Sequence, residues 1–550
     1  MTKKLNKLKG VIFDFDGTLV SIHIDFKKLK KNLLEKAEEA SFQIPDKNLP
    51  ILEFLEYIRK NNSENNKTED FISDINMSLL NEEIRSAEKA RPLPGSLKLI
   101  KDLSEKGIKI GIFTRNCKQA VNCVIEKFNI SCDVVITRDD VCNVKPAREH
   151  LEKTAKLLGL KNNEILVVGD HSMDIKSAKN FQALSCGIVS EYFTRYDFEQ
   201  EEADFIFENL EDIGYLFGIK PLKTGKLPNG LLEYLLKTYI KNDSSVIEGP
   251  KIGVDCAVFK PDADILFAKT DPITLVGSDI GTYLVNVNIN DILVMGGMPR
   301  WFLCSLIFQQ GTTLNEIEGV FSQISYHCNK YNINWIGGHT EISESVKNNV
   351  ACGFLTGVNI KNRHKREEAI KEGDKVFLVR EVGIEAVSII AREKYEFLKE
   401  HFEVEILDRL VNSIKIPGIN ILNEAKLLWE NFPIKAMHDP TEGGLSTALY
   451  ELAYRYKIGI EFTEEKLIFH PYIWELASIF DLNPYGIISS GCIVGIIGVN
   501  QAEAMAEFMK TKGVKCAIIG EVVGKDGVYI KSGKEEKKLT VFERDEITKL

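Results

Sequence analysis

The stretch at residues 9–20, KGVIFDFDGTLV, decides the fold because an apolar run leads directly into two acidic residues and a glycine. The run at 10–15 is short, β-branched and aromatic, which predicts a buried parallel strand with Asp14 at its carboxyl end. Asp16-Gly17-Thr18 predicts a sharp turn out of the sheet. Ligands bind at that end of open α/β sheets, and neighbouring carboxylates there repel each other unless a cation or a proton neutralises them. The pattern indicates a metal site, although taken alone it fits a plain strand and Asp-Gly turn equally well.

The bulk composition excludes several classes of protein. A chain of 550 residues is too long for one core and predicts roughly three or four domains. A net charge of −10 and a pI near 5.6 argue against nucleic acid or an anionic membrane surface as the main partner. No apolar run approaches the ~20 residues that span a bilayer, and the basic N-terminus leads straight into the first strand. The 11 cysteines form no CxxC pair, which predicts reduced thiols and a cytoplasmic protein.

The segment after Val20 is charged, and its apolar residues recur at helical spacing until Pro92-Leu93-Pro94-Gly95. This pattern predicts a helical insertion directly after the first strand. Its position makes it a candidate lid over the Asp14 end of the sheet. The alternative is an additional helical layer that takes no part in binding.

Strands and helices then alternate, and polar residues stand at their junctions. A strand over 108–113 ends in Thr114, Lys145 precedes Pro146 and a helix, and a strand over 165–168 ends in Gly169-Asp170. Asp174 falls in the first turn of the next helix. Because the carboxyl ends of parallel strands share one edge, the pattern predicts an α/β fold with a doubly wound parallel sheet and its site along that edge.

Four motifs now stand in order, each on its expected element: DFDGT, FTRN, a lysine before a proline, and GDHSMD. Over residues 1–215 this set resembles the haloacid dehalogenase (HAD) superfamily of phosphohydrolases. The helical insertion resembles the small cap of the phosphoglycolate-phosphatase-like branch. The resemblance implies a Rossmann-like domain over 1–219 with a cap at about 21–93.

The resemblance also implies a mechanism. Asp14 would attack phosphorus and form an aspartyl-phosphate, which splits hydrolysis into two steps. Asp16 would protonate the leaving oxygen and then deprotonate the attacking water. Thr114 would offer a hydroxyl, and Lys145 a positive charge, to the phosphoryl oxygens as negative charge develops.

A magnesium ion completes that implied mechanism. Mg²⁺ would be bound by Asp14, by Asp170 and by the backbone carbonyl of Asp16, while Asp174 would support the metal or Lys145. His171 is expected to be a solvated turn residue. The substrate would be a small phosphorylated compound, selected in the cap around residues 23–28, with Arg115 and Arg148 as possible contacts.

A new domain is expected from about Leu227, where acidic residues and glycines concentrate in several short segments. Glycine-rich turns that open helices expose backbone N–H groups suited to phosphate, and carboxylates at strand ends or on a facing helix are hard ligands for Mg²⁺ with a nucleotide. A buried Asn286–Asn290 pair, core histidines and a simple Asp-Pro turn are the alternatives. The candidate ligands of the nucleotide and its metal are Asp255, Asp271, Asn290, Asp291, Gly337, Gly338, His339 and Asp439.

The ordered segments GVDCAVF, KTDPIT, VNVNINDILVMGG, GGHTE and DPTEGGL resemble the aminoimidazole-ribonucleotide (AIR) synthase-like superfamily, which includes thiamine-monophosphate kinase, selenophosphate synthetase and HypE-type maturation proteins. The resemblance implies a PurM-like domain of α/β and α+β halves, over 220–365 and 366–550. It implies ATP with Mg²⁺ in the cleft, Asp271 and Asp291 at the metal, and a homodimer formed through strands of the first half.

Departures from these families leave the substrate open. The sequence ends in DEITKL without the cysteine of HypE-type proteins, and no cysteine or lysine-containing glycine-rich arm precedes Asp255 as in selenophosphate synthetase. The sequence therefore predicts a bifunctional enzyme, a Mg²⁺-dependent phosphatase fused to an ATP-dependent domain. The alternative is that the C-terminal part is a nucleotide-binding maturation or scaffold module that docks a partner protein.

Overall fold

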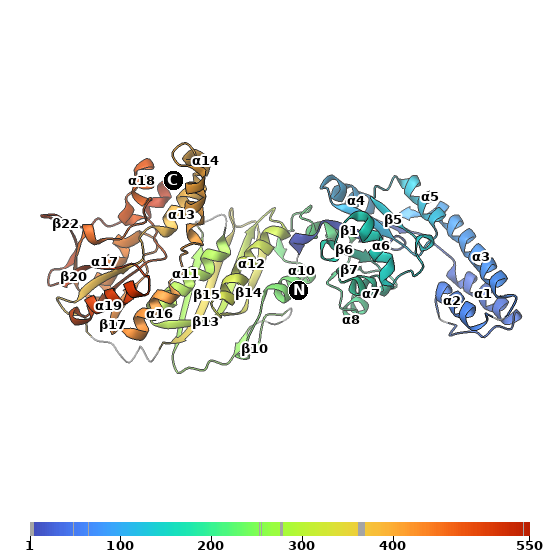
Figure 1. Cartoon of the computed structure of the whole chain (residues 1–550), viewed down its shortest axis with the longest axis horizontal. Helices are drawn as coiled ribbons and strands as arrows, with labels where there is room; N and C mark the ends of the chain where they lie inside the picture. Colours follow the sequence, from blue (N-terminus) through green and yellow to red (C-terminus); the bar gives the residue numbers. More distant parts are fainter. Residues whose placement is uncertain are drawn as a thin grey trace. The chain divides into compact units, whose positions relative to one another are not determined.

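The computed structural model describes residues 5–47, 49–63, 65–251, 254, 256–274, 279–360, 369–542 and 544–550. Asp255, a predicted ATP ligand, lies outside these residues. The chain forms two compact units (Figure 1). The first comprises Met1–Lys223, Pro228–Thr238 and Gly311–Ile317, and the second comprises Thr224–Leu227, Tyr239–Gln310 and Glu318–Leu550. Among the described residues, no helix combines the length and apolar content needed to cross a membrane.

The first unit is built on a six-stranded sheet in the order β5-β4-β1-β6-β7-β8, with every neighbouring pair parallel. This confirms the predicted doubly wound sheet. Helices α6 and α7 pack on β4 to β7, so polar residues after β1, β4 and β6 meet at one edge. The elements are β1 (Gly10–Phe13), β4 (Lys109–Phe113), β5 (Val134–Ile136), β6 (Ile165–Gly169), β7 (Leu184–Ile188), β8 (Phe205–Phe207), α4 (Ser96–Glu105), α5 (Lys118–Phe128), α6 (Arg148–Leu158), α7 (Ser172–Phe181), α8 (Arg195–Gln200), α9 (Ile213–Leu216) and α10 (Asn229–Tyr239).

The predicted helical insertion is also confirmed. Helices α1 (Phe26–Glu39), α2 (Ile51–Asn61) and α3 (Thr68–Lys89) lie between the two short paired strands β2 (Val20–Ser21) and β3 (Arg91–Pro92). They share a separate apolar core, in which burial of each large side chain contributes roughly 1.5–3 kcal/mol. That core contains Leu33, Ala37, Phe42, Ile51, Phe54, Leu55, Ile58, Phe71, Ile72, Ile75 and Leu79.

Two ion pairs hold this cap against the carboxyl end of the parallel sheet. Glu53 on α2 lies 2.6 Å from Nη2 of Arg115, which follows β4. Glu83 on α3 pairs with Arg138, which follows β5, and also accepts the Cys117 backbone N–H at 3.0 Å. Arg138 in turn donates to the Arg115 carbonyl oxygen at 3.0 Å. The cap therefore covers the edge where the predicted catalytic residues meet.

The second unit begins with a mixed five-stranded sheet in the order β12-β15-β13-β14-β9. Helix α11 is buried along nearly its whole length and packs across β12, β13 and β15. A separate ribbon pairs β10 with β11. The elements are β9 (Gly225–Lys226), β10 (Val246–Glu248), β11 (Val258–Phe259), β12 (Leu266–Ile273), α11 (Ile280–Val294), β13 (Gly297–Gln309), α12 (Leu314–Lys330), β14 (Asn334–Ser343) and β15 (Val350–Asn359).

A mixed seven-stranded sheet follows, in the order β17-β19-β16-β20-β18-β21-β22. Helix α16 packs against α11, and the Trp429 indole donates to the Leu293 carbonyl at 2.7 Å, so α11 contacts both halves of this unit. The elements are β16 (Lys375–Val379), α13 (Ile384–Glu393), α14 (Tyr395–Leu398), α15 (Val404–Val411), α16 (Leu422–Asn431), β17 (Ile434–His438), α17 (Gly444–Tyr456), β18 (Gly459–Thr463), α18 (Ile473–Ile479), β19 (Ile493–Ile497), α19 (Val499–Thr511), β20 (Cys516–Val523), β21 (Gly527–Ser532) and β22 (Glu535–Lys538).

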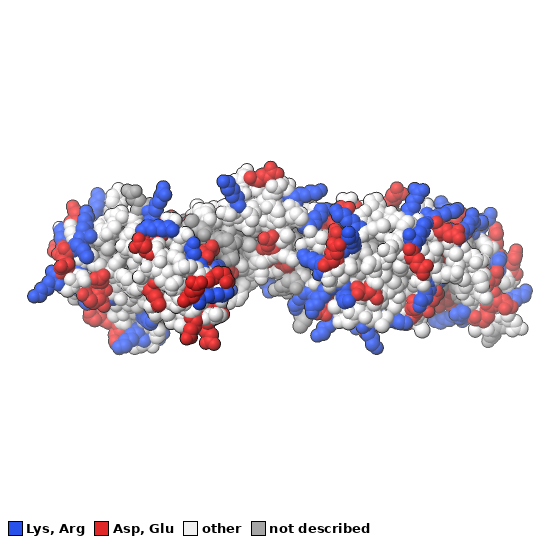
Figure 2. Space-filling model, turned by 90° about the horizontal axis from the view of Figure 1, so that it is seen from above, with Lys and Arg blue, Asp and Glu red and all other residues white. Residues whose placement is uncertain are grey.

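Charged side chains of both signs are mixed on the face shown in Figure 2. Lys and Arg alternate with Asp and Glu along both units, and neither sign forms a continuous stripe on that face. A stripe of positive charge is the usual footprint of a nucleic-acid site, and this face presents none.

The turn after β1 depends on a glycine that cannot be replaced without strain. Gly17 has φ +85°, and a Cβ there would lie 2.2 Å from Oδ2 of Asp170. We expect Gly17→Ala to destabilise the first unit by about 2–3 kcal/mol, since a left-handed alanine and a displaced buried carboxylate both cost energy. Gly159→Ala is the matched control, because Gly159 has φ +70° but no atom within 4 Å of a Cβ. Denaturant unfolding of both variants measures the difference, and equal losses would contradict the account.

Candidate active sites

Three carboxylates meet at the edge of the parallel sheet. Oxygen atoms of Asp14, Asp170 and Asp174 all lie within 4.8 Å of one another. Asp14 follows β1 and Asp170 follows β6, which are neighbouring parallel strands, so their carboxyl ends coincide. Asp174 lies in the first turn of α7, where its Oδ2 accepts the His171 N–H at 3.1 Å. The structure thus brings together three of the four residues predicted to hold the metal.

Lys145 lies among these carboxylates and is 4% exposed. Its Nζ is 2.5 Å from Oδ1 of Asp14 and 2.8 Å from Oδ1 of Asp174. It also lies 4.3 Å from the centre of the Phe113 ring. Burial alone would lower the pKa of Lys145, but the two carboxylates raise it overall. The lysine therefore remains charged and fixes the orientation of Asp14.

The single positive charge of Lys145 does not balance the three carboxylates. Burial raises the pKa of Asp14 to about 6, with Lys145 opposing the shift. Burial followed by repulsion from Asp14 raises the pKa of Asp170 to about 6. Acids shift in this way when their charged forms lack sufficient compensation. A hard divalent cation such as Mg²⁺ prefers oxygen ligands and would supply that compensation, so the residues present fit the metal.

Asp16 and Thr114 border this cluster in different ways. Oδ1 of Asp16 accepts the Ile22 N–H at 2.8 Å, and its carboxylate is not part of the three-carboxylate cluster. Burial raises the pKa of Asp16 to about 7. Thr114 follows β4 and is 1% exposed, with its Oγ1 accepting the Asn116 N–H at 3.2 Å. Sequence reasoning missed Thr18, whose hydroxyl donates to Oδ1 of Asp170 at 2.9 Å, although Thr18 lies within the DFDGT motif.

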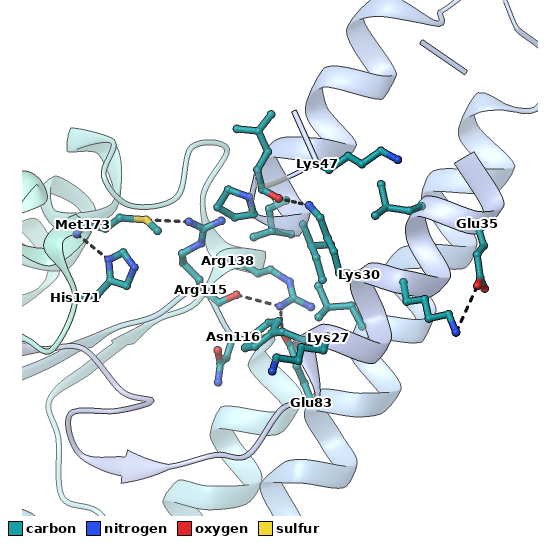
Figure 3. A pocket seen from close by; sticks show the side chains of 18 of the residues that line it. Lys27, Lys30, Glu35, Lys47, Glu83, Arg115, Asn116, Arg138, His171 and Met173 are labelled. Carbon is teal, nitrogen blue, oxygen red and sulfur yellow. Dashed lines mark hydrogen bonds and ion pairs between the residues drawn. The ribbon is translucent and has the colours of Figure 1, made fainter. Parts of the chain in front are cut away.

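A cavity of about 880 Å³ opens between the cap and this edge of the sheet (Figure 3). Arg115 lines it, whereas Arg148 does not and pairs instead with Glu152 at 3.4 Å. His171 also lines the cavity and is half-buried, which corrects the expectation of a solvated turn residue. Its ring accepts the Met173 N–H at 3.0 Å and so caps α7, and burial lowers its pKa to about 4.

A second group of carboxylates lies in the other unit. Asp439 follows β17 and is 1% exposed, and neither of its carboxylate oxygens has a hydrogen-bond partner among the described residues. Nζ of Lys269 lies 2.9 Å from Oδ2 of Asp291 and 3.6 Å from Oδ2 of Asp271. Asp291, Asp439, Lys269 and His438 line one cavity of about 460 Å³. Burial and the nearby Asp291 raise the pKa of Asp439 well above its usual range.

The buried oxygens of Asp439 mean that this second site also fits a cation with oxygen ligands. Lys269, which sequence reasoning missed, stands two residues before Asp271 on β12 and therefore on the same face of the strand. That spacing in KTDP was the available signal. Asp271 does not end β12, because the strand continues to Ile273. Pro272 is tolerated there because β12 is an edge strand that pairs only with β15.

The side chain of Asn290 is used in hydrogen bonds within the protein. Its side chain is fully buried, with Nδ2 donating to the Ile419 carbonyl at 2.9 Å and Oδ1 accepting the Ile421 N–H at 3.2 Å. Both polar atoms are therefore used to join α11 to a loop of the second half. The open alternative of a buried structural amide accounts for Asn290.

The GGHTE segment is not a phosphate-binding turn. Gly337 and Gly338 lie inside β14, where a Cβ on Gly338 would be 2.0 Å from the Cys304 carbonyl oxygen. These glycines allow close approach of β13 and β14. His339 is half-buried, with Nε2 3.1 Å from Oε2 of Glu341. None of these three predicted ligands lines the cavity beside Asp439.

The N-terminus of α17, which follows a glycine turn, already binds a carboxylate of the protein. The Gly443 N–H donates to Oδ2 of Asp545 at 2.7 Å. A carboxylate from a distant part of the chain therefore takes the position that the sequence suggested for phosphate, which is the kind of anion a helix N-terminus favours.

Comparison with known proteins gives three family matches. Residues 11–188 match the haloacid dehalogenase-like hydrolase family, residues 253–358 match the N-terminal domain of AIR synthase related protein, and residues 371–532 match its C-terminal domain. Both resemblances inferred from the motifs are thus confirmed.

The relatives fall into the same two groups. A protein of Methanocaldococcus jannaschii named for hydrogenase expression and formation is 30% identical over 266 residues, 47% of this chain and 76% of its own length. Carbamoyl dehydratase HypE of Rhizobium leguminosarum bv. viciae is 24% identical over 289 residues, 51% of this chain and 80% of its own. Pyrophosphatase PpaX of Halalkalibacterium halodurans is 32% identical over 132 residues, 24% of this chain and 61% of its own.

A solved structure of Escherichia coli HypE, described as a hydrogenase maturation protein, superposes with a TM-score of 0.49 and 20% identity, covering 58% of this chain and 98% of that one. Together with the three matched segments, the relative at 30% identity decides the family. The chain belongs to the AIR-synthase-related, HypE-like family and carries a haloacid-dehalogenase-like hydrolase domain ahead of the two AIR-synthase-related domains.

Proposed function

We propose that the first unit hydrolyses phosphomonoesters through an aspartyl-phosphate on Asp14. The observation that carries this proposal is the placement of Asp14 against Lys145 at 2.5 Å, inside a cluster with Asp170 and Asp174. A nucleophilic carboxylate needs such a neighbour, since a fixed cation orients it and attracts the phosphoryl oxygens. The relative named a pyrophosphatase supports a substrate that carries a phosphoryl group.

Asp14, Asp16 and one water molecule account for every bond and proton in the two steps of hydrolysis. Oδ of Asp14 forms a bond to phosphorus while the ester P–O bond breaks, and Asp16 gives its proton to the departing alkoxide. Water then attacks phosphorus, Asp16 takes a proton from it, and the bond between phosphorus and Asp14 breaks to release phosphate. An acid with a pKa of about 7 is suited to both proton transfers near neutrality.

Asp14, Asp170 and the backbone carbonyl of Asp16 would hold Mg²⁺. When bound, the ion would supply positive charge opposite the charge that develops on the phosphoryl oxygens. Asp174 is the better candidate for positioning Lys145, because its Oδ1 accepts from the lysine and its Oδ2 accepts from His171. Thr114 would donate its hydroxyl to a phosphoryl oxygen.

For the second unit we propose ATP binding with Mg²⁺ at Asp271, Asp291 and Asp439. The specific observation is the buried carboxylate of Asp439, which lacks a partner among the described residues beside Asp291. The relatives named carbamoyl dehydratase HypE support a HypE-like role, and the small-molecule substrate stays open.

ATP turnover by the purified protein would favour an enzyme, whereas turnover only with a partner protein would favour a docking module. A homodimer through the strands of the first half belongs to the same proposal.

Loss of the nucleophile is the first test. We expect Asp14→Asn to lower phosphomonoester hydrolysis at least about a thousandfold, because no other group forms the covalent intermediate. Asp70→Asn is the matched control, since Asp70 is exposed on α3. Initial rates with phenyl phosphate and Mg²⁺ measure the effect. Equal activity of the wild type and Asp14→Asn would refute the mechanism.

Metal binding should be visible in stability. We expect Mg²⁺ to raise the melting temperature of the first unit by a few degrees at about ten times its Kd. Asp170→Asn should remove that shift and also raise the melting temperature without metal. The pKa of Asp170 in the folded state is raised to about 6, so above that pH its ionised carboxylate destabilises the folded protein. This destabilisation decreases as the pH falls below about 6 and the carboxylate becomes protonated. The gain from Asp170→Asn should therefore be present above about pH 7 and largely absent below about pH 5. Calorimetry that finds a metal shift retained in Asp170→Asn would count against this site.

The second site can be tested independently. We expect the double variant Asp271→Ala and Asp439→Ala to weaken binding of ATP with Mg²⁺ at least about tenfold by titration calorimetry, because oxygen ligands of the cation are removed. Phosphomonoester hydrolysis should be unchanged. Glu341→Ala is the control, because Glu341 is a carboxylate on the same sheet that does not line the cavity. If the double variant loses both activities while remaining folded, the proposal of two separate sites is wrong.

A further inference from the structure

The cavity under the cap adjoins the phosphatase site along two loops. Arg115 and Asn116, which line it, directly follow Thr114, and His171 directly follows Asp170. The opposite wall comes from α1, α2 and α3 of the cap (Figure 3). Asp14 itself does not line the cavity, but the loops that follow Thr114 and Asp170 do, so the cavity is the nearest described space for the alcohol of a phosphomonoester bound at Asp14.

The cavity is large for a small substrate. Its volume of about 880 Å³ lies near the upper end of the roughly 300–1,000 Å³ that hold drug-sized ligands. A two-carbon leaving group would leave most of that wall without contact. Binding energy from parts of the substrate remote from the reacting centre is available only if the substrate reaches them, so the cavity suits a larger alcohol.

The basic side chains in the cavity outnumber the acidic ones. Both arginines are already neutralised, because Arg115 pairs with Glu53 at 2.6 Å and Arg138 pairs with Glu83. The six basic lining residues are Lys27, Lys30, Lys31, Lys47, Arg115 and Arg138, and the three acidic ones are Glu35, Glu38 and Glu83.

Two of the four lysines that line the cavity are also paired with carboxylates. Lys31 pairs with Glu35 at 3.8 Å and Lys47 pairs with Glu38 at 3.3 Å. Lys30 donates to the Leu49 carbonyl oxygen and lies 4.7 Å from the centre of the Phe54 ring. Neither Lys30 nor Lys27 has an ion pair among the described residues, and Lys27 also lacks the carbonyl and ring contacts that hold Lys30. Figure 3 shows Lys27 and Lys30 extending from α1 toward Arg115 and Arg138.

The remaining wall of the cavity is apolar. Phe26, beside Lys27 at the start of α1, lines the cavity and is 53% exposed, so its ring is accessible to a ligand. A planar or branched apolar group placed against it would be favourable, since burial of aromatic surface contributes about 25 cal/mol per Å². Leu34, Ile51, Leu52 and Leu79 complete this wall.

We propose that the phosphatase site selects phosphomonoesters whose alcohol has an apolar body and, at its far end, an anionic group that pairs with Lys27. The inference rests on the proposed phosphatase function and adds the class of substrate. The apolar body would lie against Phe26 and the leucine-rich wall, and the anion would neutralise the unpaired cation. Phosphomonoesters that are short, or that end in a cation, would be poor substrates.

Two nearly isosteric esters test the charge. Para-carboxymethylphenyl phosphate and para-aminoethylphenyl phosphate have the same aryl body and similar leaving groups, but opposite distal charges. We expect the wild type to hydrolyse the carboxylate with a kcat/KM about tenfold higher. Lys27→Met keeps the apolar stem of the side chain and should lower kcat/KM for the carboxylate about fivefold, the upper range of an exposed ion pair, while changing the amine less than about twofold. Lys27→Glu should reverse the preference.

Lys60→Met is the matched control, because Lys60 is an exposed lysine of the cap on α2 that does not line the cavity. It should behave as the wild type. Three results would overturn the substrate class: equal kcat/KM for the two esters, an equal effect of Lys27→Met on both, or faster hydrolysis of phosphoglycolate than of either aryl ester. If Asp14→Asn still abolishes hydrolysis in that case, the proposed phosphatase function stands. Absence of any Asp14-dependent hydrolysis would overturn the proposed function, and the substrate class with it.

Discussion

The ion pairs of Lys145 with Asp14 and Asp174 determine the chemistry of the first unit. Asp14 and Asp170 follow neighbouring strands and Asp174 lies in the first turn of α7, and this single lysine compensates only part of the charge of these three carboxylates. The raised pKa values of Asp14 and Asp170 follow from that imbalance. Because of this excess negative charge, the edge of the parallel sheet favours binding of a cation or an electrophile, either of which relieves the repulsion between the carboxylates.

The second unit repeats this arrangement on a different fold. Asp439 follows a strand, Asp291 comes from a facing helix, and Lys269 lies between Asp291 and Asp271. In both units one lysine lies against two carboxylates. The two sites share no residues and belong to separately packed units, so each can be analysed through substitutions that leave the other intact.

The sequence was sufficient for features that depend on neighbouring residues. An apolar run that ends in Asp14, followed later by a second run that ends in Gly169-Asp170, already implied two parallel strands with adjacent carboxylates. Features that depend on distant contacts could not be predicted. Asn290 bonds to a loop about 130 positions away, and the Gly443 N–H bonds to Asp545, and neither contact can be inferred from neighbouring residues in the sequence. Gly338 was mistaken for a turn residue because the close approach of β13 and β14 is visible only in the folded sheet. The cap could be located from its helical periodicity. The ion pairs of its lysines could not, because they depend on the packing of the helices, and so the sequence did not show that Lys27 has no ion pair among the described residues.

The cap connects the fold to substrate choice. Glu53 and Glu83 reach from its helices to arginines that follow β4 and β5, so ion pairs fix the cap over the reacting edge and already neutralise those arginines. Recognition then passes to α1, whose first turn presents an aromatic ring and a cation to the cavity. The covalent chemistry and the selection of the alcohol would thus reside in different layers of one unit.

The most direct test of the central claim is to trap the covalent intermediate. The protein would be mixed with an aryl phosphate and Mg²⁺, quenched in acid within one turnover, digested and analysed by mass spectrometry, because acyl phosphates survive acid but not base. The account predicts one phosphoryl group on the peptide that contains Asp14, lost on treatment with base and absent from Asp14→Asn. Release of phosphate without any phosphorylated Asp14 peptide would contradict it.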